Sequence, residues 1–180
     1  LTGGLNDAVH GGVDLRALPK ADFAQWAVCV ALDGGVREGK NDVQVVLVHD
    51  KQREEMAHFE PGNFSHTLNA KAFNDAHLGE FTVTSVATDD PISKETYFEE
   101  VMETLLHHDE VKRVMLIPDS ETGTTYDRLR QLLRHADDDT KRITLFAMEP
   151  MPGGNFRQEL LGYSLMSALG IKSEEINQKI

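Results

Sequence analysis

The feature that most constrains the fold is the alternation of strand-like and helix-like segments from residue 81 onward. Residues 81–88 (FTVTSVAT) alternate in polarity and are rich in β-branched side chains, and residues 113–117 and 142–148 are almost continuously apolar. Between them, residues 92–108 and the segment after Tyr126 carry apolar side chains at helical spacing. Strands and helices in this order predict a mainly parallel sheet with helices packed on both faces.

The first half of the chain completes the predicted fold. Two β-type runs, Trp26–Leu32 and Val43–His49, are separated by ten residues, which are too few for a crossover helix, so we expect antiparallel neighbours. Residues 51–59 and 65–78 are predicted to be helical, as are residues 156–169. The predicted fold class is therefore α/β, a Rossmann-like three-layer sandwich with a mixed, mostly parallel sheet of about five strands. Residues 1–24 are predicted to form an irregular N-terminal arm, and residues 25–180 a single α/β domain.

Charge and hydropathy limit the classes of partner. The 180 residues include 18 Lys and Arg against 30 Asp and Glu, a formal net charge of −12. This balance disfavours binding to nucleic acid and to anionic membranes. No apolar stretch approaches the roughly 20 residues that span a bilayer, and no charged segment followed by an apolar one marks a signal peptide. We therefore expect a cytoplasmic protein with no membrane association. Cys29 is the only cysteine, so no intrachain disulfide can form.

An acidic residue follows each predicted strand of the parallel part of the sheet. These residues are Asp50, Asp89, Asp119 and Glu149, and His49 stands beside the first of them. Because ligands of open α/β sheets bind beyond the carboxyl ends of the strands, the four acids are candidate ligands of Mg²⁺ or Mn²⁺. His49, Asp50 and Asp119 are the candidate catalytic residues. The alternative is that these acids cap helices and bind no metal.

Two loops that lead from a strand into a helix are candidate ligand-binding segments. In PDSETGTT (118–125) the candidates are Thr122, Gly123 and Thr124, since small residues leave backbone N–H groups available to an anion. Neighbouring acids would repel a bare phosphate there. The loop PGGNFR (152–157) is the stronger anion candidate. Its ligand-binding residues would be Gly153, Gly154, Asn155 and Arg157.

Two short segments resemble known families. The S-x-T-G-x-T pattern in Ser120, Thr122, Gly123 and Thr125 is similar to the phosphate-binding loop of flavodoxins, which implies phosphate binding at that turn. In residues 114–148 a strand, an acidic residue, a helix and a strand follow one another, an order that resembles that of PIN/NYN-type nucleases. That resemblance implies carboxylates that hold Mg²⁺ or Mn²⁺, with Asp119 as the matching acid.

The sequence leaves two functions open, and with them the question of whether the chain is an enzyme. The first is a non-catalytic or regulatory α/β domain that acts through protein association. It would act as a homo-oligomer through the C-terminal helix, whose apolar stripe (156–169) is wider than one core face needs. The alternative is a cation-dependent domain that binds or hydrolyses a phosphoryl or nucleotide ligand at the acidic carboxyl ends of the strands.

Overall fold

The structure is a computed structural model, and it describes residues 20–118, 125–134, 141–154 and 156–162. The described elements follow one another along the chain as β1 Ala21–Asp22, α2 Phe23–Asp33, β2 Asn41–Asp50, β3 Phe59–Glu60, the π-helical turn η2 Phe64–Leu68, β4 Lys71–Asp75, β5 Gly79–Thr88, α3 Pro91–His107, β6 Arg113–Leu116, α4 Thr125–Leu133, β7 Arg142–Ala147 and β8 Arg157–Leu160.

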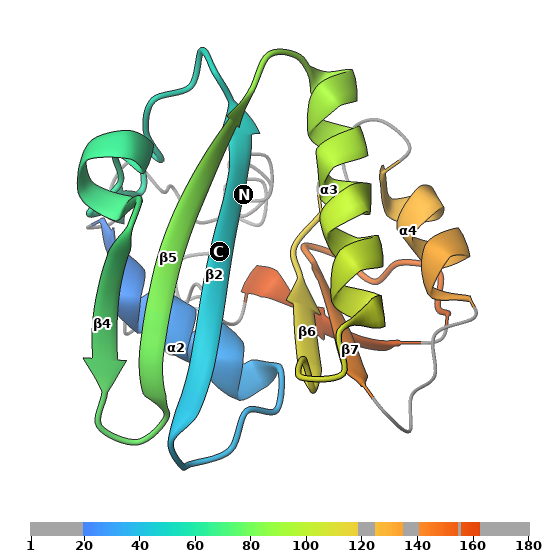
Figure 1. The fold of residues 1–180 in the computed structure, drawn as a ribbon, viewed down its shortest axis with the longest axis horizontal. Coiled ribbons are helices and arrows are strands. Elements are labelled where there is room, and N and C mark those ends of the chain that lie inside the picture. The colour runs from blue at the N-terminus through green and yellow to red at the C-terminus, as the bar shows by residue number, and fades with distance from the viewer. Residues whose placement is uncertain (1–19, 119–124, 135–140, 155, 163–180) are drawn as a thin grey trace, which may run out of the picture.

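The described strands form three small sheets, so the predicted five-stranded three-layer sandwich is wrong. β1 pairs with β3, β2 and β4 flank β5, and β6, β7 and β8 form a parallel sheet. In the second sheet, β2 runs parallel to β5 while β4 runs antiparallel to it. Figure 1 shows β4, β5 and β2 on one side of the molecule and β6 and β7 on the other. No ladder of hydrogen bonds joins these two sheets in the part of the chain that the structure describes.

The segment predicted as a first strand is helix α2, and the prediction that it pairs with residues 43–49 is wrong. Asp22 caps the helix, because its carboxylate accepts a hydrogen bond from the N–H of Gln25 at 3.1 Å. The buried side chains recur at helical spacing, and they are Phe23, Trp26, Ala27, Val30 and Ala31. The apolar run Trp26–Leu32 resembles a strand only when the cap at Asp22 and the first turn of the helix are left out.

Residues 51–78 form short strands and turns, so the two helices predicted there are also wrong. The turn between β4 and β5 is tied by Asp75, whose Oδ2 accepts hydrogen bonds from the N–H groups of His77 and Leu78 at 3.0 and 2.9 Å. Gly79 then has a φ of +106°, a conformation that side chains other than glycine rarely adopt. Pairing with β5 decides the structure of residues 71–75, and local helical spacing does not.

Helix α2 packs against both three-stranded sheets. One core cluster joins Trp26 and Val30 of α2 to Leu47 of β2, Val83 of β5 and Phe146 of β7. Helices α3 and α4 cover the opposite face of the β6–β7–β8 sheet. The buried residues of that second cluster are Met102, Val114, Leu116, Tyr126, Leu129, Leu133, Ile143 and Leu145. The β6–β7–β8 sheet is thus enclosed from two sides, with α2 on one face and α3 and α4 on the other.

The predicted helix at 92–108 and the strands at 81–88, 113–117 and 142–148 are confirmed as α3, β5, β6 and β7. The helix predicted at 156–169 begins instead with β8, and its residues beyond 162 lie outside the described part. Most of the predicted N-terminal arm also lies outside it, so the division after residue 24 stays a prediction. No helix in the described ranges is both long enough and apolar enough to cross a membrane.

Candidate functional site

The predicted acidic residues are distributed over two sheets. Asp50 and Thr88 are register partners at the ends of β2 and β5, so Asp50 and Asp89 share one sheet edge. Each carboxylate there faces a lysine, with 3.3 Å from Lys94 Nζ to Asp50 Oδ2 and 3.9 Å from Lys51 Nζ to Asp89 Oδ1. Glu149 follows β7 in the other sheet. Within the described ranges, no three His, Cys, Asp or Glu side chains are grouped so that they could hold a metal ion.

His49 is held by contacts that stabilise a turn. Its ring stacks on Phe64, with centroids 3.9 Å apart and planes 7° from parallel. Its Nδ1 lies 3.0 Å from the carbonyl oxygens of both Asp50 and Arg53. Because both of these groups are acceptors, Nδ1 carries the proton and donates to them. A catalytic role for His49 and Asp50 stays a prediction.

The glycine loop before β8 is anchored to α4 through its carbonyl groups. Arg130 donates from Nε and Nη2 to the carbonyl of Gly153 at 3.1 and 2.8 Å, and the Tyr126 hydroxyl donates to the carbonyl of the preceding proline at 3.0 Å. Burial raises the pKa of Tyr126, so the hydroxyl keeps this proton at neutral pH. Gly153 and Gly154 are exposed, and Arg157 is the first residue of β8. Five other predicted site residues, Asp119, Thr122, Gly123, Thr124 and Asn155, lie outside the described residues.

The structure instead brings together arginines that begin successive parallel strands. Arg113 opens β6, Arg142 opens β7 and Arg157 opens β8. Arg113 is the register partner of Arg142, and Arg157 is the partner of Thr144, two residues further along β7. Because side chains alternate along a strand, these three arginines leave the same face of the sheet. Met115 and Phe146, which share that face by the same alternation, pack in the cluster with α2.

Two of these guanidinium groups meet over the end of α2. Arg113 Nη1 donates to the carbonyl of Gly34 at 2.9 Å, at the C-terminal end of that helix. A Cβ placed on Gly35 would lie 2.8 Å from Arg113 Nη1 and 3.8 Å from Arg157 Nη1. Gly35 has a φ of +88°, a conformation that favours glycine, and a side chain there would also displace the Arg113 guanidinium.

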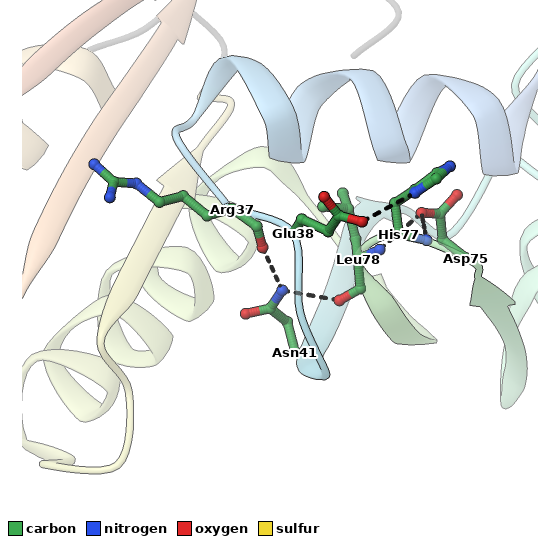
Figure 2. A network of polar contacts seen from close by, with 6 residues as sticks. All are labelled: Arg37, Glu38, Asn41, Asp75, His77 and Leu78. Atoms are coloured by element: carbon green, nitrogen blue, oxygen red, sulfur yellow. Dashed lines mark hydrogen bonds and ion pairs between the residues drawn. The ribbon is translucent and has the colours of Figure 1, made fainter.

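Arg37 joins this group from the loop that leads from α2 into β2. Asn41 holds the loop by donating from Nδ2 to the carbonyls of Arg37 and Leu78 at 2.8 and 2.9 Å. Glu38 and His77 form an exposed contact with 3.4 Å between Oε1 and Nδ1. Figure 2 shows that the Arg37 guanidinium extends away from this network. We call Arg37, Arg113, Arg142 and Arg157 the arginine cluster.

The positive charges of the other three arginines act on Arg113. The pKa of Arg113 is lowered, first by burial and then by the positive charges of Arg142, Arg37 and Arg157. Glu159 Oε1 lies 2.5 Å from Arg157 Nη2 and offsets one of these charges. In the part of the chain that the structure describes, no carboxylate forms an ion pair with Arg37, Arg113 or Arg142.

Comparison with models of protein families gives one match, which covers residues 12–176 and is described as a family of unknown function, DUF6621. The chain belongs to the DUF6621 family. No curated protein matches it, and no solved structure matches it. All four residues of the arginine cluster lie inside the segment that matches DUF6621.

Of the cluster, the sequence predicts only Arg157 as a site residue of this DUF6621 chain, at the end of the loop 152–157 and before a helix, whereas the structure places it at the start of β8. The sequence does carry a signal for two of the others, because an arginine directly precedes each of the apolar runs VMLI and ITLFA. Parallel strands begin at the same sheet edge, so these arginines are expected to be neighbours. The rule that ligands bind at the carboxyl ends of parallel strands points to the other end of these strands, so it does not predict the cluster.

Proposed function

We propose that this DUF6621 chain is a non-catalytic binding domain whose arginine cluster holds the anionic group of a ligand. The observation that carries the proposal is the convergence of four arginines, from three strands and one loop, in a chain with a net charge of −12. Guanidinium groups match carboxylate and phosphate oxygens in pairs of parallel hydrogen bonds, which makes arginine well suited to anion recognition.

Gathering like charges opposes folding unless an anion compensates them. Two unit charges about 7 Å apart repel by about 0.6 kcal/mol in water and about 2.4 kcal/mol at an effective dielectric constant of 20. Arg113 has a structural role, since it donates to the last turn of α2, and Arg157 pairs with Glu159. Arg37 and Arg142 have exposed side chains without such a partner among the described residues. Anion binding accounts for their position near Arg113.

The non-catalytic part of the proposal is supported by the ion pairs at the opposite end of the sheets. Asp50 Oδ2 faces Lys94 and Asp89 Oδ1 faces Lys51, so a lysine offsets part of the charge of each carboxylate, while Asp50 Oδ1 is buried without a hydrogen bond from the described residues. Association with another protein stays a prediction for this chain. An anionic ligand is compatible with it, because the anionic group can belong to a partner protein.

Thermal unfolding in different anions tests the proposal. At constant ionic strength, we expect at least one multivalent anion among sulfate, citrate and pyrophosphate to raise the Tm relative to chloride. A ligand at about 100 times its Kd stabilises by about 2.7 kcal/mol, which corresponds to about 5–10 °C for a chain of this size.

The matched variants are Arg142→Gln and Arg53→Gln, which remove the same charge inside and outside the cluster. Arg53 is exposed in the turn after β2, at the far end of that strand from Arg37. The proposal predicts that the anion-dependent rise shrinks in Arg142→Gln and is kept in Arg53→Gln. Equal responses of both variants, or no rise in any anion, would contradict it. This comparison also separates binding from the general stabilisation by sulfate and phosphate.

A further inference from the structure

The chemistry and placement of the arginine cluster narrow the class of its ligand. We infer that the cluster binds a phosphate group that carries two or more negative charges, on a small ligand or on a phosphorylated protein. This inference rests on the proposed function, because it names the ligand of that same site.

The number of charges argues against a single carboxylate. The cluster contributes four positive charges, and Glu159 offsets the one on Arg157. A lone carboxylate would leave most of this charge uncompensated, whereas a phosphate ester or a diphosphate supplies two or three negative charges at neutral pH. The net charge of −12 elsewhere opposes a long polyanion such as nucleic acid and favours a compact group that fits within the cluster.

The elements from which the donors come favour a tetrahedral group. Arg113, Arg142 and Arg157 approach from three neighbouring strands, and Arg37 comes from the loop between α2 and β2. A planar carboxylate is satisfied by one or two guanidinium groups in its own plane, whereas phosphate oxygens accept hydrogen bonds from several sides. Gly35 adds to this argument, because the Arg113 and Arg157 guanidinium groups both approach its backbone, with Nη1 atoms 2.8 and 3.8 Å from the position that a Cβ would take.

Isothermal titration of the full chain with pyrophosphate and with citrate tests the inference. At neutral pH and equal ionic strength the two anions carry similar charge, so the comparison isolates phosphate from carboxylate chemistry. We expect pyrophosphate to bind one to one and roughly tenfold more tightly than citrate. The double variant R37Q/R142Q should weaken pyrophosphate binding by about tenfold or more, while R53Q changes it less than about twofold. Circular dichroism of each variant verifies that it is folded.

A second arm distinguishes the two sources of phosphate. The probes are a serine peptide, the same peptide phosphorylated, and pyrophosphate. If the phosphopeptide binds at least as tightly as pyrophosphate, the site is assigned to a phosphorylated protein. If pyrophosphate binds more tightly, the site is assigned to a small ligand. Either result supports the inference that the arginine cluster binds a phosphate group.

The results that would contradict the phosphate inference alone differ from those that would also contradict the proposed function. Citrate binding as tight as that of pyrophosphate, and weakened by R37Q/R142Q, would overturn the phosphate inference and leave the proposed function intact. Absence of binding by both anions, or binding that R37Q/R142Q does not weaken, would overturn the inference and the proposed function together.

Discussion

Removing one charge from the arginine cluster is expected to stabilise the free protein. Arg142 is exposed, forms no ion pair within the described residues, and is the register partner of Arg113 on the neighbouring strand. Arg142→Gln keeps most of the side chain and removes the positive charge. Because this positive charge acts on that of Arg113, its loss relieves repulsion that the folded chain otherwise contains.

The magnitude follows from Coulomb's law and the exposure of the side chain. For a separation taken as about 7 Å, two positive charges repel by about 0.6 kcal/mol in water and about 2.4 kcal/mol at a dielectric constant of 20. Exposure places Arg142 near the lower value, so we expect a gain of about 0.5–1 kcal/mol at low ionic strength. For a chain of this length, that gain raises the Tm by about 1–4 °C.

Urea unfolding at low salt and at about 1 M salt measures the effect, because the Debye length falls to about 3 Å at the higher concentration. The gain in stability from Arg142→Gln should disappear at the higher salt concentration. Arg53→Gln changes the net charge equally and controls for repulsion among the acidic groups. A loss of stability in Arg142→Gln at low salt, or the same change in both variants, would refute the electrostatic reasoning.

Three further predictions concern the fold. Gly79→Ala should destabilise by about 1–3 kcal/mol in urea, because the new Cβ would lie 2.7 Å from the N of Asn41 at a positive φ. Gly153→Ala should change stability far less, because its Cβ would lie 4.0 Å from Gln158 Nε2. Asp22→Ala should lower the stability by about 1 kcal/mol, because the α2 cap is lost. Asp22→Asn keeps a capping oxygen and should change the stability little, so equal losses in both variants would argue against the cap. Burial raises the pKa of Cys29, so its reaction with a disulfide reagent should stay slow at neutral pH and accelerate only at a higher pH than for a free thiol; a fast reaction at neutral pH would contradict this.

The elements that the sequence predicts correctly are those whose local pattern and tertiary environment agree. α3 has a long amphipathic repeat, and β6 and β7 are apolar because helices cover the sheet that contains them. Trp26–Leu32 was misassigned because β-branched and small apolar residues suit either structure, and the cap at Asp22 decides for a helix. Residues 71–75 become a strand because β5 pairs with them, which local spacing does not encode.

The candidate site was harder to predict than the fold because its residues meet through tertiary structure. The alignment of Arg113 with Arg142 follows from parallel pairing and could be expected from the sequence. The approach of Arg37 depends on the end of α2 and on the contacts of Asn41, and 76 positions separate Arg37 from Arg113. Because Trp26–Leu32 is predicted to be a strand and not part of helix α2, the sequence does not predict the position of the loop that carries Arg37.

The most direct test of anion binding at the arginine cluster is a crystal structure of the protein with selenate, a tetrahedral dianion that is located by its anomalous scattering. We predict an anomalous peak over Gly35, within hydrogen-bond distance of the guanidinium groups of Arg113 and Arg157. Ordered selenate at other positions, with none at the arginine cluster, would contradict the proposal.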